Sequence, residues 1–343
     1  MASLPPTTRV WAAQEAKGQL VSLEIPLPAL GSFDTAIKVI HCGICHSDLH
    51  LIDNDWRISE YPLVPGHEII GRVEALGPEV RHLKRGDVVG VGWQSGSCLE
   101  CHYCHTGREN LCESSGATCV GRVGGFADWH VTDSRFCFKI PDNLVTPGTA
   151  PLLCGGATVF SPLCEFVGNR SPWRTHVGVI GMGGLGHMAL KMAQRMGYEV
   201  TAFTNSPHKA SDLKVLGAHH VVSSNSEADI VKAGRRLDLI ISTAPYDLPW
   251  NAYLRTLRPD GTLCFVGVPP SPLSIHAMNL LGGRLRVAGS PIAGRARMEE
   301  MLEFCSRHGI TAQSEVFEAA RVNDAIAAVR SGKVRYRAVL SFS

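Results

Sequence analysis

Four cysteines stand close together in the chain, with a spacing typical of a metal site. Their thiols fall within fifteen residues, at Cys98, Cys101, Cys104 and Cys112. Four thiolates can enclose a tetrahedral zinc ion and leave no open position, as a structural site requires. A ferredoxin-type iron–sulfur run begins the same way but continues with three residues and Cys-Pro, whereas seven residues and no proline follow here. The pattern favours structural zinc, with His102 and His105 as alternative ligands.

Three further segments carry residues that can bind a metal together. Cys45 lies in GICHSDLH, His67 in GHE and Cys154 in LCGGAT. Each segment alone has a structural explanation, because a cysteine near a histidine is usually just packed and GHE can be any turn that enters a strand. Together they supply two thiolates and one imidazole. A catalytic zinc needs three protein ligands and an open fourth position, so the set predicts such a site.

A glycine-rich loop follows the apolar segment HVGVI and precedes a helical stretch. Its glycines are Gly181, Gly183, Gly184 and Gly186, with Leu185 before the last. In a GxGxxG loop the first glycine permits a tight turn, the second lets the backbone approach a pyrophosphate, and the third lets the helix pack on the strand. Amide groups at the helix N-terminus then face the phosphates. The strand before, the helix after and five later strands favour a dinucleotide site over a structural turn.

The segment about twenty residues further on indicates which dinucleotide binds. An NAD-binding sheet usually has an Asp or Glu there, which bonds the ribose hydroxyls and would repel the 2′-phosphate of NADP. This chain has hydroxyl, amide and amine groups instead, at Thr204, Asn205, Ser206 and Lys209. Such groups can bind phosphate through charge-assisted hydrogen bonds. NADP(H) is therefore favoured, and use of both cofactors, or a polar turn without discrimination, are the alternatives.

The chain shows two different patterns of predicted secondary structure, one before and one after about residue 150. The first 150 residues read as short β-rich pieces separated by Gly and Pro, such as 36–41, 68–76 and 87–91. From His176 onward, six apolar strands alternate with helical stretches, which predicts an α/β fold with a doubly wound parallel sheet in the order 3-2-1-4-5-6. The helical stretches include 207–216 and 250–257. The last fifty residues add helices at 298–308 and 323–331 and a strand, YRAVLSF.

This change of pattern predicts two domains, one of them discontinuous. A chain of 343 residues exceeds what one hydrophobic core usually covers. We expect residues 1–150 and 291–343 to form a catalytic domain that carries the cysteine lobe at about 93–115. Residues 151–290 are expected to form the dinucleotide-binding domain.

Composition excludes several function classes. The net charge is +2 with both signs scattered, so neither a nucleic-acid stripe nor a polybasic membrane anchor is present. The start, MASLPPTTRV, lacks the apolar core of a signal peptide, and the uncharged stretch 143–164 contains too many prolines and glycines for a spanning helix. We expect a cytoplasmic protein. Its twelve cysteines then indicate metal or thiol chemistry rather than disulfides. Six are expected to be small buried hydrophobic residues: Cys42, Cys119, Cys137, Cys164, Cys264 and Cys305.

Over nearly its whole length, the sequence resembles the zinc-containing medium-chain alcohol dehydrogenases, and among them the cinnamyl alcohol dehydrogenase-like aldehyde reductases. Besides the cysteine lobe and the glycine loop, the shared motifs are CGICHSDLH at 42–50, YPLVPGHEIIGRV at 61–73, GGFADW at 124–129, PLLCGGATVFSPL at 151–163 and VRYRAVL at 334–340. The resemblance implies a GroES-like catalytic domain and a Rossmann domain, with the active site in the cleft between them. It also implies a homodimer joined at Rossmann sheet edges.

The resemblance also implies roles for individual residues. Cys45, His67 and Cys154 match the catalytic zinc ligands, and Glu68 an acidic neighbour that can approach the metal. Asp48 matches a carboxylate that orients His67. Ser47 matches the hydroxyl group that is bonded to the substrate oxygen. His50 matches the outer end of a proton relay that runs through the cofactor ribose. Positions that flank the nicotinamide are matched by Thr158, Val268 and Ser290. Thr204, Asn205, Ser206 and Lys209 match the phosphate pocket, where Asn205 departs mildly from a serine run that is common in the family.

The implied activity is reversible hydride transfer between NADP(H) and an alcohol or aldehyde, with two zinc ions per chain. By analogy, Trp56 and Trp93 border the substrate, which favours aromatic or bulky apolar aldehydes such as cinnamaldehyde. The alternatives are an NAD-dependent zinc polyol or secondary-alcohol dehydrogenase, a zinc-free quinone reductase, and a non-catalytic dinucleotide-binding protein. The polyol enzymes commonly have an acidic ligand where Cys154 stands, and the quinone reductases lack Cys45, His67 and the cysteine lobe.

Overall fold

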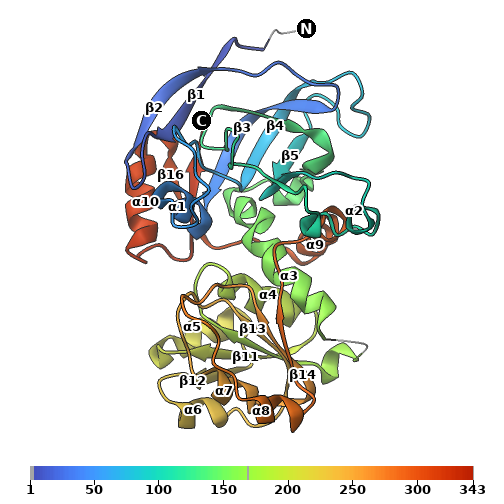
Figure 1. Ribbon diagram of the computed structural model, residues 1–343, viewed down its shortest axis with the longest axis vertical. Helices are drawn as coiled ribbons and strands as arrows, with labels where there is room; N and C mark the ends of the chain where they lie inside the picture. Colours follow the sequence, from blue (N-terminus) through green and yellow to red (C-terminus); the bar gives the residue numbers. More distant parts are fainter. Residues whose placement is uncertain (1–3, 168–169, 343) are drawn as a thin grey trace. The chain divides into compact units, whose positions relative to one another are not determined.

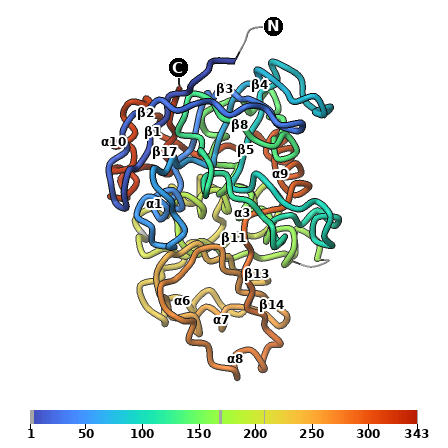
Figure 2. The backbone as a smooth tube through the Cα atoms, turned by 45° about the horizontal axis from the view of Figure 1, so that its top comes forward, coloured from blue at the N-terminus to red at the C-terminus, as the bar shows by residue number. Residues whose placement is uncertain are grey.

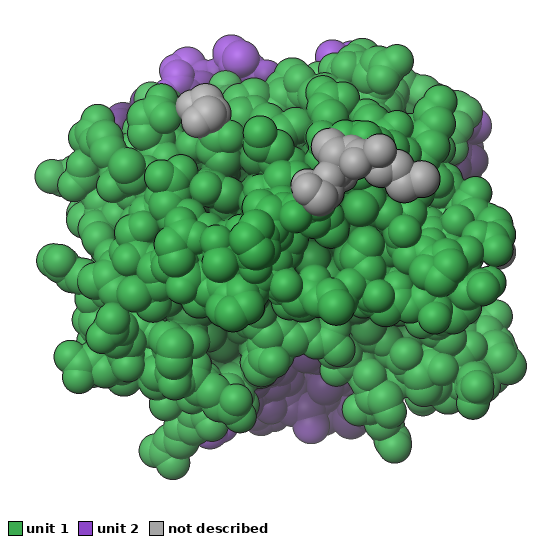
Figure 3. Space-filling view, turned by 90° about the horizontal axis from the view of Figure 1, so that it is seen from above, with its two compact units in different colours: residues 1–154, 293–343 green, residues 155–292 purple. Residues whose placement is uncertain are grey.

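The computed structural model describes residues 4–167 and 170–342. The chain forms two compact units, shown in different colours in Figure 3. Unit 1 comprises Met1–Cys154 and Ala293–Ser343, and unit 2 comprises Gly155–Ile292. Cys154 is therefore the last residue of unit 1 before the chain enters unit 2, and it belongs to the same unit as Cys45 and His67.

Unit 1 is rich in β-structure (Figure 1). Its strands are β1 (Thr7–Ala13), β2 (Leu20–Pro26), β3 (Asp34–Ile44), β4 (Ile69–Leu76), β5 (Val88–Val91), β6 (Gln94–Gly96), β7 (Gly116–Ala117), β8 (Trp129–Asp133), β9 (Cys137–Lys139), β16 (Ser314–Glu318) and β17 (Arg337–Ser341). Its helices are α1 (His46–Asp53), α2 (His102–His105), α9 (Arg295–His308) and α10 (Val322–Arg330), with 3-10 turns η1 (Glu109–Leu111), η2 (Ser134–Phe136), η3 (Asp142–Leu144), η4 (Pro147–Leu153) and η7 (Ala319–Arg321).

The main sheet of unit 1 has seven strands, in the order β16-β17-β3-β4-β5-β9, with β8 also paired to β3. Its pairs are antiparallel except β16 with β17, which are parallel. Helix α10 packs against β16, β17 and β3, and Figure 2 shows it beside β17. The sheet thus brings β17, near the end of the chain, beside β3, where Ala338 pairs with Ile44 just before the start of α1.

A tight turn before β4 carries two of the expected site residues. Gly66 has a φ of +104°, and a Cβ atom there would lie 2.5 Å from a ring carbon of Phe126. Only glycine combines that backbone conformation with that close packing. The turn sends His67 and Glu68 into the interior of unit 1, where both side chains are fully buried.

Unit 2 alternates strands and helices. Its strands are β10 (His176–Ile180), β11 (Glu199–Thr204), β12 (His220–Ser223), β13 (Leu237–Ser242), β14 (Leu257–Phe265) and β15 (Arg286–Gly289). Its helices are α3 (Gly155–Glu165), α4 (Gly186–Arg195), α5 (Ala210–Val215), α6 (Glu227–Val231), α7 (Trp250–Leu254) and α8 (Ala277–Leu281), with 3-10 turns η5 (Pro172–Arg174) and η6 (Pro207–Lys209).

The sheet of unit 2 confirms the expected fold. Its six strands lie in the order β12-β11-β10-β13-β14-β15, which is 3-2-1-4-5-6, and all pairs are parallel. Helices α3 and α4 pack on each other, α4 also against β10 and β11, and α3 against β13. Every residue of β13 is buried, as expected for a central strand covered on both faces.

The predicted secondary structure differs from the observed one at several places, and three of them are informative. Helix α7 ends at Leu254 instead of Leu257, because Pro259 cannot continue a helix and favours extended backbone before it. The helix expected over 207–216 begins as the 3-10 turn η6 and becomes α5 only at Ala210. Strand β16 was not predicted, since its sequence SEVFE is mostly polar and at most half-buried. In the described part of the chain, no helix combines the length and apolarity needed to cross a bilayer.

Candidate active site

Asp48 connects the start of α1 with the turn before β4. Its Oδ2 atom accepts the Cys45 N–H at 2.8 Å, and Oδ1 accepts the Gly66 N–H at 2.9 Å. Oδ1 also lies 2.9 Å from Nδ1 of His67. The carboxylate is fully buried, yet three N–H groups compensate its charge. It fixes the tautomer of His67 with the proton on Nδ1, which leaves Nε2 free to bind a metal.

Four buried side chains offer metal-binding atoms to one another. One ligand atom each of Cys45, His67, Glu68 and Cys154 lies within 4.8 Å of the others. Nε2 of His67 and Oε2 of Glu68 have no hydrogen-bond partner, although both atoms are buried. Buried polar atoms without partners are rare, and a bound cation would satisfy both. Two thiolates, an imidazole and a nearby carboxylate match the ligands that zinc prefers.

The charges of this cluster are coupled. A hydrogen bond between Cys45 and Cys154 lowers the pKa of Cys45 well below its ordinary value and raises that of Cys154. Burial lowers the pKa of His67, but the charges of Asp48 and Cys154 outweigh it, so that the pKa is raised. The arrangement therefore holds thiolate character beside an imidazole before any metal is considered.

Arg337 of β17 forms a buried ion pair with Glu68. Its Nη2 atom donates to Oε1 of Glu68, and the two side chains are 4% and 0% exposed. Burial raises the pKa of Glu68 to about 7, although Arg337 counteracts it. Gly43 gives the carboxylate its space, since a Cβ atom there would lie 2.0 Å from Oε2.

Ser47 and His50 lie one turn apart on α1, so their side chains project from the same face. Oγ of Ser47 is 3.7 Å from Sγ of Cys45, which puts a hydroxyl group beside the metal-binding cluster. Nδ1 of His50 lies 2.7 Å from Oδ2 of Asp55, and these side chains are 42% and 49% exposed. A proton acceptor at the surface thus follows a hydroxyl group at the cluster along one helix.

Two tryptophans extend from the cluster toward solvent. The ring of Trp93 meets His67 edge-on at 4.9 Å, and Trp56 meets Trp93 edge-on at 6.0 Å. Trp56 also stacks on His50 at 5.2 Å and is 40% exposed. These rings form an apolar wall that begins at the metal-binding cluster.

The four-cysteine lobe has the dimensions of a tetrahedral metal site. Its sulfur atoms are 3.5 Å apart between Cys98 and Cys112, 3.6 Å between Cys101 and Cys104, and 3.8 Å between Cys98 and Cys104. Four sulfurs at the usual zinc distance of about 2.3 Å would be about 3.8 Å apart. Backbone N–H groups of Glu100 and Cys101 lower the pKa of Cys98 to about 6, which favours a thiolate. His102 and His105 are not members of this group.

Glu109 ties the lobe to the start of α9. Its carboxylate accepts the backbone N–H of Arg295 at 3.0 Å and Nε of the same residue at 2.9 Å. Glu109 is 1% exposed, whereas the Arg295 side chain is 34% exposed, so the carboxylate is the buried partner of this pair. A Cβ atom on Gly294 would lie 2.1 Å from the Gly107 carbonyl oxygen, which shows how closely the lobe meets this helix.

The glycine-rich loop of unit 2 joins β10 to α4. Gly181 has a φ of +89°, and a Cβ atom on Gly186 would lie 1.8 Å from the Gly181 carbonyl oxygen. A Cβ atom on Gly183 would meet nothing within 4 Å, so the backbone there is open to a ligand. Gly184 and Leu185 complete the turn before α4. This geometry fits a pyrophosphate against the helix N-terminus.

The segment after β11 presents polar groups without an acid. Thr204 ends the strand, and its Oγ1 accepts the Ser206 N–H at 3.0 Å. Ser206 in turn donates to the side chain of Asn205 at 3.1 Å. Asn205 and Lys209 are exposed. The other expected cofactor residues lie elsewhere in unit 2: Thr158 in α3 and Ser290 after β15 are buried, whereas Val268 is 78% exposed.

Residues 31–142 match the family model of the alcohol dehydrogenase GroES-like domain, and residues 184–307 match that of the zinc-binding dehydrogenases. The chain belongs to the zinc-binding alcohol dehydrogenase family. It is accordingly an oxidoreductase of alcohols and aldehydes.

Several characterised members of the family resemble this dehydrogenase along their whole length. The aldehyde reductase AdhA of Synechocystis is 44% identical over 335 residues, which cover 98% of this chain and 99% of the relative. A sorghum cinnamyl alcohol dehydrogenase structure has a TM-score of 0.92 at 39% identity, covering 98% and 97% of the two chains. The Helicobacter pylori enzyme complexed with NADP(H) has a TM-score of 0.89 at 32% identity, covering 98% and 99%.

Three residues of the dehydrogenase site were missed in the sequence. Arg337 lies in the motif VRYRAVL and Asp55 lies shortly after CGICHSDLH. Their involvement in the site became visible only from the contact of Arg337 with Glu68 and of Asp55 with His50. Cys119 was expected to be a buried hydrophobic residue, and it also contacts His67. Cys164 is only half-buried, which corrects its expected full burial.

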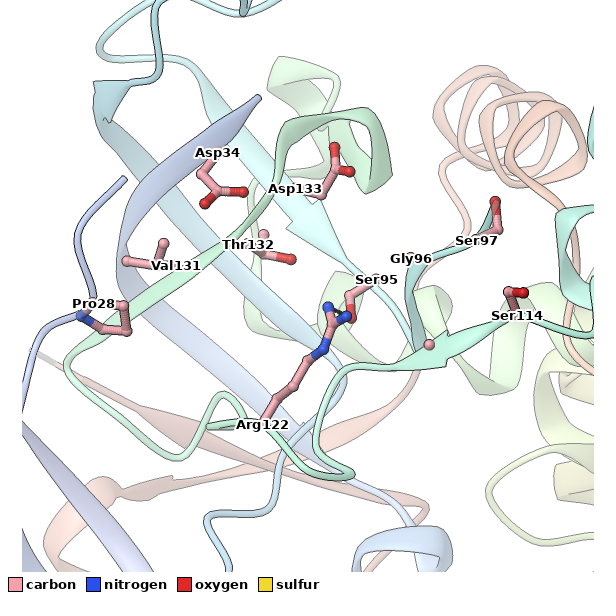
Figure 4. Close-up of a pocket in the computed structure, with 11 residues that line it drawn as sticks. Pro28, Asp34, Ser95, Gly96, Ser97, Ser114, Arg122, Val131, Thr132 and Asp133 are labelled. Atoms are coloured by element: carbon pink, nitrogen blue, oxygen red, sulfur yellow. Dashed lines mark hydrogen bonds between the residues drawn. The ribbon is translucent and has the colours of Figure 1, made fainter. Parts of the chain in front are cut away.

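A separate polar pocket of about 410 Å³ lies in unit 1 (Figure 4). Its wall includes Arg122 and the hydroxyl groups of Ser95 and Ser97, faced by the carboxylates of Asp34 and Asp133. None of the candidate site residues lines it, so it is distinct from the metal-binding cluster.

Proposed function

We propose that this dehydrogenase is a zinc-dependent, NADP(H)-preferring aldehyde reductase with a broad range that favours aromatic or bulky apolar aldehydes such as cinnamaldehyde. One observation carries the proposal. Two thiols and an imidazole with an unpartnered Nε2 converge in a buried cluster, and the hydroxyl group of Ser47 lies beside it.

Two zinc ions per chain fit the donor sets. Cys45, His67 and Cys154 would hold the catalytic ion. The carboxylate of Glu68 could approach this ion while water or product exchanges at the open position. Cys98, Cys101, Cys104 and Cys112 would hold the structural ion. Three protein ligands at the first site leave a position for the substrate oxygen, whereas four thiolates close the second.

The side chains of unit 1 supply the proton chemistry. Bound zinc contributes a Lewis acid that stabilises negative charge on the substrate oxygen, and NADPH contributes the hydride. Ser47 donates a proton to that oxygen during aldehyde reduction and accepts it during alcohol oxidation. His50 exchanges the proton with solvent, and Asp55 orients its ring. Asp48 keeps the Nε2 atom of His67 directed at the metal position.

The preference for NADP(H) rests on the segment after β11. Asn205 and Lys209 are exposed there, so an amide and an ammonium group are available to a 2′-phosphate. The similar Helicobacter pylori enzyme was solved with NADP(H), which supports the same assignment here. We assign the dinucleotide to unit 2, with Gly181 to Gly186 at the pyrophosphate and Thr158, Val268 and Ser290 near the nicotinamide.

The substrate preference rests on the wall formed by Trp56 and Trp93. Stacked or edge-on rings beside a planar substrate contribute about 0.5–1.5 kcal/mol beyond the buried area. The similar sorghum protein is a cinnamyl alcohol dehydrogenase, which agrees with an aromatic substrate.

The proposal also includes a cytoplasmic location and a homodimer. Strand β15 ends the sheet of unit 2, and Met278 and Leu281 nearby in the sequence are 63% and 73% exposed, as an interface would require.

Initial rates with cinnamaldehyde test the proposal. Zinc is first quantified on the purified protein, and NADPH and NADH oxidation are then measured in identical reactions. We expect two zinc ions per chain and a clearly higher kcat/KM with NADPH. A higher value with NADH would contradict the phosphate-pocket assignment, and equal kcat/KM for acetaldehyde and cinnamaldehyde would contradict the aromatic wall. No activity of zinc-replete protein across an aldehyde panel would overturn the function.

A further inference from the structure

Cys119 is a buried thiol that the proposed mechanism does not use. It is 0% exposed and precedes the loop that leads to β8. Its sulfur, a ring nitrogen of His67 and a carboxylate oxygen of Asp48 all lie within 4.8 Å of one another. The thiol therefore lies beside the contact of His67 with Asp48, which helps to orient the imidazole toward the metal-binding cluster.

The backbone around Cys119 is anchored to the same aromatic wall that contacts His67. The N–H of Thr118 donates to the Trp93 carbonyl oxygen at 2.8 Å, and its hydroxyl group donates to the Gly92 carbonyl oxygen at 2.5 Å. Trp93 itself packs edge-on against the His67 ring at 4.9 Å. The imidazole thus lies among Asp48, Trp93 and Cys119, and the backbone beside Cys119 is bonded to that of Trp93.

We propose that Cys119 is a positioning residue for His67. The inference rests on the proposed function, because it assigns Cys119 an effect on the metal that His67 would bind. The buried thiol fills the space beside the imidazole, so the ring is hindered from turning its unpartnered Nε2 atom away from Cys45 and Cys154.

A thiol suits this position better than a stronger hydrogen-bonding group. Asp48 already accepts three N–H donors, and a thiol is a weak donor that does not compete strongly with them. Its polarisable sulfur still fills the space. Removal of the sulfur would leave a void too small for water beside a ring that must keep one orientation.

The test is zinc release from the holoenzyme to a chromogenic chelator, measured well below the Tm of each variant. Cys119→Ala removes the bulk of the side chain, Cys119→Val keeps it, and Cys119→Ser keeps only part of it. Cys305→Ala is the matched control, since Cys305 is also 0% exposed but contacts Met301 in α9. The absorption spectrum of cobalt-substituted protein reports on the metal ligands independently of activity.

We expect Cys119→Ala to release one of its two zinc ions about 10-fold faster than the wild type, the lower end of the range for partners of metal ligands. Cys119→Val should release it within about 3-fold of the wild-type rate, because it keeps the bulk, and Cys119→Ser about 3-fold faster than the wild type. The cobalt spectrum should shift in the alanine variant, and kcat should fall more than KM rises.

Wild-type release rates and cobalt spectra in the alanine variant would overturn the inference, as would equal acceleration in Cys305→Ala. If Cys119→Ala does not fold, the serine variant decides by the same comparison, with the valine variant as its volume-matched reference. A wild type that holds only the structural zinc would be recognised at the start by its zinc content, and it would overturn both the proposed function and this inference. A wild type with two zinc ions and no response to Cys119 substitution overturns this inference alone.

Discussion

The guanidinium of Arg337 donates a hydrogen bond to the carboxylate of Glu68, 269 positions earlier in the chain, and neither side chain reaches solvent appreciably. The contact places the last strand of the chain against the turn that carries His67. It also leaves Oε2 of Glu68 without a partner and within reach of the metal-binding cluster. One buried cation thus holds the carboxylate through one oxygen and keeps the other free.

Arg337→Met should strongly destabilise the protein. The substitution leaves the Glu68 carboxylate buried without its cation, which typically costs about 3–5 kcal/mol. Urea unfolding of the zinc-loaded protein measures this free energy. Arg81→Met is the control, because Arg81 is 73% exposed and should change stability by less than about 0.5 kcal/mol. Equal stability of the two variants would show that the buried pair contributes nothing, and Glu68→Gln combined with Arg337→Met should recover part of the loss.

Ser47→Ala should lower kcat/KM for aldehyde reduction by about 100-fold, since it removes the hydroxyl group that exchanges a proton with the substrate oxygen. Ser47→Thr retains a hydroxyl group and should keep most of the activity. Both variants should contain two zinc ions, measured by native mass spectrometry. Full activity of the alanine variant would limit Ser47 to a structural part in α1.

Cys101→Ser should reduce the zinc content from two ions to one and leave the catalytic ion in place. Because Glu109 of the lobe caps α9 through Arg295, loss of the lobe's order should also lower the Tm. We expect a fall of about 5 °C or more, as each kcal/mol lost shifts the Tm by about 2–4 °C. Cys137→Ser, a buried thiol outside the lobe, serves as the control, and its zinc content should stay at two.

Asn205→Asp should shift the cofactor preference toward NADH. The new carboxylate would stand where the 2′-phosphate is expected, and we predict an increase of about 10-fold in KM for NADPH, equivalent to about 1.4 kcal/mol. Asn205→Ser keeps a neutral hydrogen-bonding group and should behave like the wild type. An unchanged KM for NADPH in the aspartate variant would place the 2′-phosphate elsewhere.

Asp53→Asn should destabilise the protein in a pH-dependent way. Asp53 forms a two-point ion pair with Arg330, at 2.5 and 2.7 Å, which joins α1 to α10. Arg330 lowers the pKa of Asp53 below its usual value of 3.8, so the stabilisation is present above that value and is lost as the pH falls through the lower folded-state pKa. Because Arg330 is 40% exposed, we expect only about 1 kcal/mol at pH 7.

Urea unfolding at several pH values checks this effect. The difference between wild type and Asp53→Asn should be constant above about pH 5 and shrink below about pH 4. Glu303→Gln provides the control, since its 63% exposed pair with Arg307 should contribute little at any pH. A difference that grows on acidification would contradict the assigned sign.

Features that depend on the spacing of residues within a short segment could be predicted from the sequence. The four cysteines of the lobe, the GxGxxG loop and the alternation of strands and helices in unit 2 each lie within a short segment, where residue type and periodicity constrain structure directly. The strand order of unit 2 was predicted from that alternation together with the GxGxxG loop, since a dinucleotide-binding sheet of this type has the order 3-2-1-4-5-6. The family, and with it the expected zinc ligands, came from motifs that stay contiguous in the chain.

Contacts between side chains that are distant in the chain could not be predicted from the sequence. The pairing of β17 with β3 brings Arg337 to Glu68, and the anchoring of Thr118 to Trp93 brings Cys119 to His67. Nothing in the local sequence of either residue marks it, since an arginine in a strand and a cysteine in a loop are compatible with many environments. Burial then decides what each contact does, because an ion pair or a thiol removed from water acts on its neighbour far more strongly than the same group at the surface.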